Sequence, residues 1–164
     1  MKRAIQCCLI LLTLNIGAMA QMTHGDDEAS IKKMLADQAA AWDRGDGPGF
    51  AAPFSEDADF VNIFGSVFEG KPAIAKQHSM IFAGPYKGTH LTVTLRKITF
   101  PSADVALVEA DPVVSGVHAM PPGMTPPADG VLKTRMKFVA HKTDGTWQFI
   151  AAQNTVLLPM PPPR

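Results

Sequence analysis

The sequence predicts an α+β domain in which helices cover one face of a strongly curved, mostly antiparallel sheet. Helical patterns fill the first part of the chain and alternating strand patterns fill the last part. Residues 142–145 (Lys-Thr-Asp-Gly) join the final two strands as a tight hairpin, because Asp-Gly tolerates positive φ angles. Helices followed by a run of strands are typical of α+β folds. Since a few helices cannot cover a bent sheet completely, we expect a cone-shaped cavity between the two layers.

Residues 1–20 predict a secretory signal peptide. A Lys-Arg pair gives a positive start, residues 4–16 are largely apolar, and residues 18–20 (Ala-Met-Ala) form a small-x-small cleavage pattern. The apolar run is too short for a membrane span. A lipid anchor on either cysteine would need the apolar run before the cysteine, whereas here it follows. We therefore expect an exported protein, periplasmic or secreted, with no membrane anchor.

Removal of the first 20 of the 164 residues leaves 144, enough for one domain with its own core. We interpret residues 21–26 as a mobile leader, 27–158 as the single domain and 159–164 as a proline-rich tail. The processed chain has no cysteine for disulfides or thiolate chemistry. Without the two basic residues of the signal peptide, 13 Lys and Arg stand against 15 Asp and Glu, a net charge of −2. Such a balance does not favour nucleic-acid binding, which normally uses a clustered basic face.

The first helix is predicted from about Asp27 to Arg44, because its apolar residues recur at spacings of three and four and a glycine follows. Trp42 lies at the end of its buried face. The Trp42 ring is a candidate wall of the cavity, and its N–H needs a partner when it is buried. A glycine-rich turn at residues 45–49 then leads to a short second helix over residues 50–54.

The segment from residue 54 to residue 82 contains most of the candidate site. It predicts, in order, a turn at 55–57, a strand at 59–64, a short strand around 67–69, and a helix opened by Pro72 and closed at Gly84. Strand alternation places Phe60, Asn62 and Phe64 on one side of the first strand. The helix carries His78 inside an apolar stripe that includes Phe82. If Asn62 and His78 face a common space, they line a pocket.

Four further strands are predicted at residues 90–100, 105–111, 131–141 and 146–157. The proline-rich connection at about 115–130 is long enough to be a lid or a partner contact, and surface padding is an equal alternative. The sheet face away from the helices is too long to remain wholly bare. We therefore expect a homodimer formed through this face, which includes Thr92, Thr94 and Arg96.

Four segments, taken in order, resemble the nuclear transport factor 2-like (NTF2-like, or cystatin-like) superfamily. They are residues 41–46 (AWDRGD), residues 57–74 (DADFVNIFGSVFEGKPAI), the helical His78 and residues 144–155 (DGTWQFIAAQNT). Within the superfamily they are similar to the SnoaL-like group and its subgroup of SgcJ/EcaC family oxidoreductases. The resemblance covers about residues 27–157 and implies the cone-shaped fold. The superfamily includes isomerases, dehydratases, cyclases and non-catalytic binding modules, so the fold does not select the chemistry. The chain has no glycine-rich dinucleotide turn after a strand, and we expect no cofactor.

The resemblance implies that the general-base aspartate of ketosteroid-isomerase-like relatives falls on Asn62, whose amide cannot accept a proton at neutral pH. Two functions remain open. In the first, the domain binds a small, largely apolar molecule, with polar contacts from His78, Asn62, Trp42 and Asn154. In the second, a cofactor-independent lyase or isomerase acts on a polycyclic or aromatic substrate. There His78 is the general acid/base and Asn62 polarises a carbonyl.

Each candidate residue also has a structural explanation. His78 could be a core histidine satisfied by Asn62 or by a backbone carbonyl, and Trp42 a plain core tryptophan. The side chains of Asn62 and Asn154 could close strand ends. Three phenylalanines, Phe60, Phe64 and Phe82, are ligand-binding candidates that also fit the core, and Arg135 could meet an anionic ligand or lie on a solvated outer face. The five histidines fall at no metal-ligand spacing, so we expect no metal site.

Overall fold

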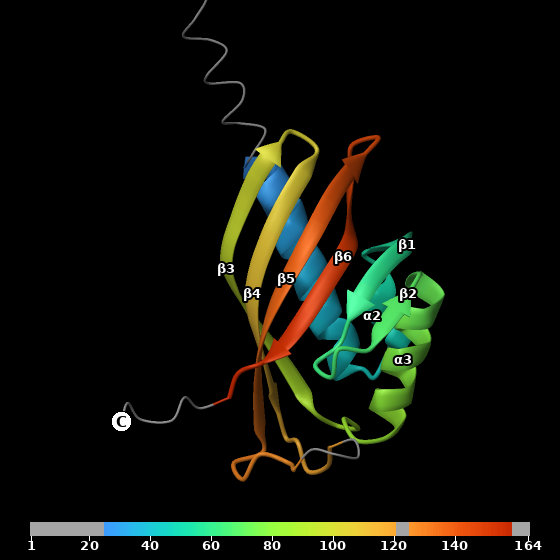
Figure 1. The fold of residues 1–164 in the computed structure, drawn as a ribbon, viewed down its shortest axis with the longest axis vertical. Helices are drawn as coiled ribbons and strands as arrows, with labels where there is room; N and C mark the ends of the chain where they lie inside the picture. Colours follow the sequence, from blue (N-terminus) through green and yellow to red (C-terminus); the bar gives the residue numbers. More distant parts are fainter. Residues whose placement is uncertain (1–24, 121–124, 159–164) are drawn as a thin grey trace, which may run out of the picture.

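The computed structural model describes residues 25–120 and 125–158. The first helix covers residues 25–43, and two further helices follow, α2 (Gly47–Ala51) and α3 (Lys71–Ala83). The strands are β1 (Phe54–Val61), β2 (Val67–Glu69), β3 (His90–Ser102), β4 (Val105–Ser115), β5 (Val131–Thr143) and β6 (Thr146–Val156). Figure 1 shows the first helix, in blue, across one face of the long strands, with α2 and α3 beside β1 and β2. The predicted signal peptide and the proline-rich tail lie outside the described residues, as does most of the leader.

The six strands form one sheet in the order β2-β1-β6-β5-β4-β3. Every neighbouring pair is antiparallel except β1 and β6, which are parallel. The pairing leaves one extra residue in β3, between Leu95 and Lys97, and one in β6, between Phe149 and Ala151. Such bulges increase the local twist and bend a sheet. The predicted α+β class with a curved, mostly antiparallel sheet is confirmed.

The third helix begins as its sequence predicts. Gly70 caps it with a positive φ of 82°, and Pro72 lies in its first turn, where the missing N–H costs nothing. The short second helix is earlier than predicted, because the Asp46 carboxylate accepts a hydrogen bond from Gly49 N at 2.8 Å and starts the helix there. Its predicted last residue, Phe54, opens β1 instead.

The turn predicted at residues 55–57 is wrong, because these residues belong to β1. Phe54 pairs with Phe149 of β6, and the register shifts before Asp59 pairs with Ala151. The intervening polar residues occupy the irregular part of the strand, where Ser55 Oγ donates to Asp57 Oδ1 at 2.9 Å. The polar side chains at residues 55–57 belong to a bulged strand. Their composition alone does not distinguish such a strand from a turn.

The core fills the space between the helices and the concave face of the sheet. Its fully buried large side chains include Ile31 of the first helix, Phe54 of β1 and Phe149 of β6. A polar clamp ties the first helix to the β5–β6 hairpin. The Asp27 carboxylate accepts hydrogen bonds from Trp147 Nε1 at 2.8 Å and from Lys142 Nζ at 2.7 Å.

Candidate functional site

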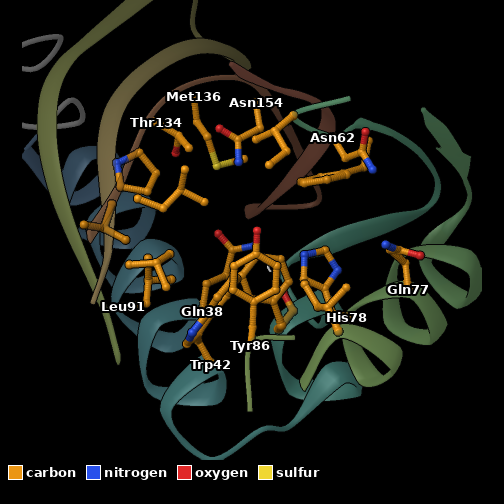
Figure 2. Close-up of a pocket in the computed structure, with 18 of the residues that line it drawn as sticks. Gln38, Trp42, Asn62, Gln77, His78, Tyr86, Leu91, Thr134, Met136 and Asn154 are labelled. Atoms are coloured by element: carbon orange, nitrogen blue, oxygen red, sulfur yellow. Dashed lines mark hydrogen bonds between the residues drawn. The ribbon is translucent and has the colours of Figure 1, made fainter. Parts of the chain in front are cut away.

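The helices and the sheet enclose a cavity of about 90 Å³ that opens to the surface. Figure 2 shows side chains from both layers converging on it. Among the described residues, the lining contains no Asp, Glu, Lys or Arg. The polar side chains that face it are Gln38, Trp42, Asn62, Gln77, His78, Tyr86, Thr134 and Asn154. The cavity is therefore an apolar space with a few uncharged polar groups.

His78 lies deep in the wall of this cavity, with 3% of its surface exposed. Its Nδ1 is 2.8 Å from the carbonyl oxygen of Ile74, one turn earlier in α3. A carbonyl can only accept, so Nδ1 carries the proton and donates. The imidazole stacks on Phe50, with ring centroids 3.9 Å apart and an interplanar angle of 21°, and meets the Phe60 ring edge-on at 5.2 Å.

These surroundings keep the imidazole uncharged. Burial lowers the pKa of His78 from 6.5 to about 4, and the hydrogen bond to Ile74 opposes this only in part. In the neutral tautomer with the proton on Nδ1, Nε2 is a hydrogen-bond acceptor. Among the described residues, Nε2 has no hydrogen-bond partner. His78 therefore offers the cavity one neutral acceptor.

Asn62 lines the cavity, but it does not extend the strand as the alternation predicts. The strand ends at Val61 and Asn62 begins a turn. Asn62 Oδ1 accepts from the backbone N–H groups of Phe64 and Ser66, both at 2.9 Å. Its carbonyl oxygen thus closes the β1–β2 hairpin, and its amide NH₂ is the part left for a ligand.

The four aromatic candidates differ in position: two form part of the cavity wall, one is buried behind the wall and one lies at the rim. Trp42 lines the wall, but its Nε1 donates to Thr89 Oγ1 at 3.0 Å and is not available to a ligand. Phe60 also lines the cavity, whereas Phe82 is buried against Trp42 with ring centroids 4.9 Å apart. The expectation of a core position is wrong for Phe64, which is 45% exposed. It lies in the turn that follows β1, and because it also lines the cavity we place it at the rim.

Arg135 is not part of this site. Thr134 and Met136 face the cavity, so alternation turns Arg135 to the other side of β5. There its Nε donates to Asp111 Oδ1 at 2.8 Å, while Arg96 Nη1 donates to Asp111 Oδ2 at 2.9 Å. The hydrogen bond from Arg135 is the main reason that the pKa of Asp111 is lowered. Of the two alternatives predicted for Arg135, the structure therefore supports the solvated outer face and not a contact with a ligand.

Four polar lining residues were not among the predicted site residues, namely Gln38, Tyr86, Thr134 and Gln77. Gln38 Nε2 donates to the Phe50 carbonyl at 3.1 Å, and the Tyr86 hydroxyl donates to Met120 Sδ at 3.5 Å. Burial raises the pKa of Tyr86, which keeps the phenol protonated. The third residue, Thr134, is the polar member of an inward-facing apolar row on β5. Thr134 could have been predicted from this row, because a polar residue at a core position is a candidate site residue.

The described residues contain neither a metal-binding cluster nor a helix that could span a membrane. Within residues 25–120 and 125–158, no three His, Cys, Asp or Glu side chains gather closely enough to hold a metal ion. The helices of that same part of the chain are too short or too polar to cross a membrane.

The cone-shaped fold and its apolar cavity define the class of protein, and the comparison with known families agrees. Residues 23–152 match the SnoaL-like domain family. The chain belongs to this family, within the NTF2-like or cystatin-like superfamily. The finer SgcJ/EcaC subgroup does not follow from this match. No curated protein matches the chain.

Solved structures share this fold. A domain of unknown function with a cystatin-like fold from Nostoc punctiforme is 32% identical, with a TM-score of 0.70 over 82% of this chain and 80% of its own. A scytalone dehydratase candidate from Novosphingobium aromaticivorans is 21% identical, with a TM-score of 0.69 over 84% and 89%. The hexachlorocyclohexane dehydrochlorinase LinA-type3 from Novosphingobium barchaimii is 16% identical, with a TM-score of 0.68 over 83% and 90%. The last two similarities show the fold alone.

Proposed function

We propose that this chain is an exported SnoaL-like domain that binds a small, uncharged, largely apolar molecule in its cavity. The observation that carries the proposal is the lack of charge in the described lining, where His78, with a pKa of about 4, is neutral at physiological pH. A charged ligand would lose its hydration without gaining an opposite charge, which is strongly unfavourable. A neutral molecule meets no such penalty.

The size and shape of the cavity narrow the ligand further. Its volume of about 90 Å³ is small beside the roughly 300–1,000 Å³ of typical ligand sites. A ligand with a single ring fits this space better than the polycyclic substrate that the sequence suggested. Part of a larger ligand would extend out of the cavity at its rim, beside Phe64. Aromatic rings of Trp42, Phe50 and Tyr86 form apolar walls, and His78 Nε2 accepts from a ligand O–H or N–H. One structural neighbour is named for hexachlorocyclohexane, which is likewise an uncharged single-ring compound.

The direct test compares a neutral ring with its charged counterpart. Cyclohexanol and cyclohexanecarboxylate are titrated at pH 7.5 while the unfolding temperature Tm is recorded. We expect a saturable rise in Tm with cyclohexanol and none with the carboxylate. In His78→Phe the rise should shrink, whereas His118→Gln, a change at an exposed histidine outside the lining, should respond as the wild type. An equal response to both compounds, or no response to cyclohexanol, overturns the proposal.

A second candidate is a cofactor-independent lyase or isomerase, favoured by the unpartnered Nε2 of His78. In this reaction Nε2 takes a proton from the substrate, and the Asn62 amide N–H polarises the substrate carbonyl. The pKa of about 4 makes the imidazole a weak base, and Nδ1 is held by a carbonyl instead of the carboxylate that would strengthen it. Activity that depends on His78 should therefore rise through pH 4 and be level above about 5, instead of titrating near the ordinary histidine pKa of 6.5.

Chloride release from hexachlorocyclohexane, the compound in the name of one neighbour, offers a direct assay for one such reaction. Release that follows the pH dependence above and is lost in His78→Phe would support catalysis. Release no faster than in buffer, or unchanged in that variant, would count against His78 as the base.

Export and assembly complete the proposal. The Ala18-Met19-Ala20 pattern supports cleavage before Gln21, which mass spectrometry of the protein from periplasmic and medium fractions would detect. We also propose a homodimer through the outer sheet face, where Thr92, Thr94 and Arg96 are exposed. A membership of the SgcJ/EcaC subgroup stays a prediction.

A further inference from the structure

Two polar side chains interrupt the apolar sheet wall of the cavity. Thr134 lies on β5 and Asn154 on β6, and both line the cavity. In the β5–β6 register, Thr134 is opposite Val156 and Met136 is opposite Asn154. The two polar residues are therefore diagonal neighbours on one face, close enough for their side chains to act on the same group. The flanking inward residues on β5 are apolar, namely Leu132, Met136 and Phe138.

Both residues carry a buried polar atom that has no hydrogen-bond partner. Among the described residues, Thr134 Oγ1 and Asn154 Oδ1 are buried and unpaired, and Thr134 is only 3% exposed. Buried polar atoms are almost always paired, because an unpaired one destabilises the fold. A valine at position 134 would fill the same space and leave nothing unpaired. The unpaired hydroxyl and amide therefore point to a partner that enters the cavity.

Thr134 and Asn154 lie across the cavity from the acceptor nitrogen of His78, Nε2. Figure 2 shows Thr134 and Asn154 on one side of the open space and His78 on the other, beside Tyr86. The space between them is bounded by apolar side chains that include Leu91 and Met136. The cavity thus has a hydrogen-bond acceptor, His78 Nε2, on the helix side and the pair Thr134 and Asn154 on the sheet side (Figure 2).

The hydrogen-bonding capacity of each position defines the group it binds. His78 Nε2 only accepts, so it requires a donor. The Thr134 hydroxyl donates and accepts, and the Asn154 amide presents its oxygen or its NH₂ according to how the side chain is turned. A ligand hydroxyl, which itself donates and accepts, satisfies both members of the pair. A ketone or an ether could only accept and would leave the His78 nitrogen unpaired.

We propose that Thr134 and Asn154 form a second polar subsite, and that the preferred ligand is a neutral ring compound with hydroxyl groups at opposite ends. One hydroxyl donates to His78, and the other binds Thr134 and Asn154. This inference rests on the proposed binding function and specifies the ligand class for the same cavity.

Calorimetric titration with trans-cyclohexane-1,4-diol and cyclohexanol tests the subsite at pH 7.5. The second hydroxyl should tighten binding roughly 5- to 10-fold, the gain expected of one or two hydrogen bonds in a buried site. Thr134→Val should remove that gain and leave cyclohexanol within about twofold of wild type, because only the second hydroxyl loses its partner. Thr155→Val, one strand away on the exposed outer side, is the matched control and should change neither affinity.

A second measurement needs no ligand. If the Thr134 hydroxyl is unpaired in the empty protein, Thr134→Val should keep or raise Tm relative to Thr155→Val. A lower Tm would show that the hydroxyl has a structural partner and would overturn the subsite. Equal affinities for the diol and cyclohexanol, with cyclohexanol still preferred to its carboxylate, would refute the subsite and leave the binding function standing. Failure of both neutral compounds to bind would refute both.

Discussion

The imidazole of His78 and the ring of Phe50 lie nearly parallel, with centroids 3.9 Å apart. The two residues come from α3 and α2, so the packing of these helices brings the hydrocarbon face of Phe50 over the histidine. This contact excludes water from one side of the imidazole, and Phe60 covers another part at 5.2 Å. Burial among such groups disfavours the charged form, which explains why the pKa of His78 is lowered to about 4.

The first prediction concerns stability against pH. The pKa of His78 is about 4 in the native state and 6.5 in the reference state. Between these values the unfolded chain binds a proton that the native chain does not, so the free energy of unfolding rises with pH there. Stability from this residue should be complete above about pH 6.5 and fall by about 3 kcal/mol on acidification below pH 4. Urea unfolding from pH 4 to 8 measures it.

His78→Phe should remove this part of the pH dependence, because phenylalanine does not titrate. His118→Gln, at an exposed position, should retain it. Carboxylates also titrate at the acidic end, so the difference between wild type and His78→Phe is the relevant quantity. Parallel curves for these two proteins would show that His78 is not buried in its neutral form.

A second prediction concerns the close approach of α2 and α3. A Cβ added at Gly47 would lie 2.6 Å from both the Ala75 carbonyl oxygen and the Ser79 nitrogen, which are backbone atoms that cannot move aside. Gly47→Ala should therefore lower the free energy of unfolding by about 2 kcal/mol. It should also loosen the Phe50–His78 contact, since α2 carries Phe50. Urea midpoints decide this, with Gly25→Ala, which adds a methyl in open space, as the control. Equal midpoints for the two variants would contradict the predicted clash.

A third prediction tests the polar clamp between the first helix and the β5–β6 hairpin. Asp27→Asn removes the charge that holds Lys142 and weakens the hydrogen bond from Trp147, which is buried. We expect a loss of about 2 kcal/mol in unfolding free energy, because buried partners are left poorly satisfied. Asp37→Asn is the matched change in an exposed pair with Lys33 and should cost less than about 0.5 kcal/mol. Similar losses in both variants would mean that the clamp adds nothing beyond a surface ion pair.

A fourth prediction concerns the proposed homodimer. Leu107 of β4 is 45% exposed and lies in a shallow groove of the outer sheet face with Val61, Val139 and Ala151. If this face joins two copies, Leu107→Lys should give a monomer where the wild type is a dimer, because the lysine would bury an unpaired charge. Light scattering at high micromolar concentration measures the mass. Leu158→Lys, outside the sheet, should remain dimeric. A monomeric wild-type protein would refute the interface.

Much of the fold was predictable because its signals are local. Alternation over a long stretch identified β3 to β6, and the Gly70-Lys71-Pro72 start identified α3. The hairpin at Asp144-Gly145 has φ angles of 50° and 78°, the positive values that this pair of residues tolerates. These features depend on neighbours in the chain and not on the rest of the molecule.

The parts of the site that were predicted poorly depend on distant or competing contacts. The Asn62 side chain binds two backbone N–H groups and turns the chain, which ended the alternation on which the position of Phe64 depended. The inward side of β5 follows from packing against the helices, so Thr134 and not Arg135 reaches the cavity. Tyr86 follows α3 in a loop, and only the folded chain brings its hydroxyl to Met120.

The most direct test of a neutral, accepting His78 is a ¹⁵N NMR titration of its imidazole, with and without cyclohexanol. We predict that Nε2 keeps the chemical shift of an unprotonated nitrogen from pH 8 down to about 5, and that cyclohexanol moves this resonance saturably while Nδ1 stays protonated. A histidine that takes up a proton near pH 6.5, or an Nε2 resonance that does not respond to the alcohol, would contradict the account.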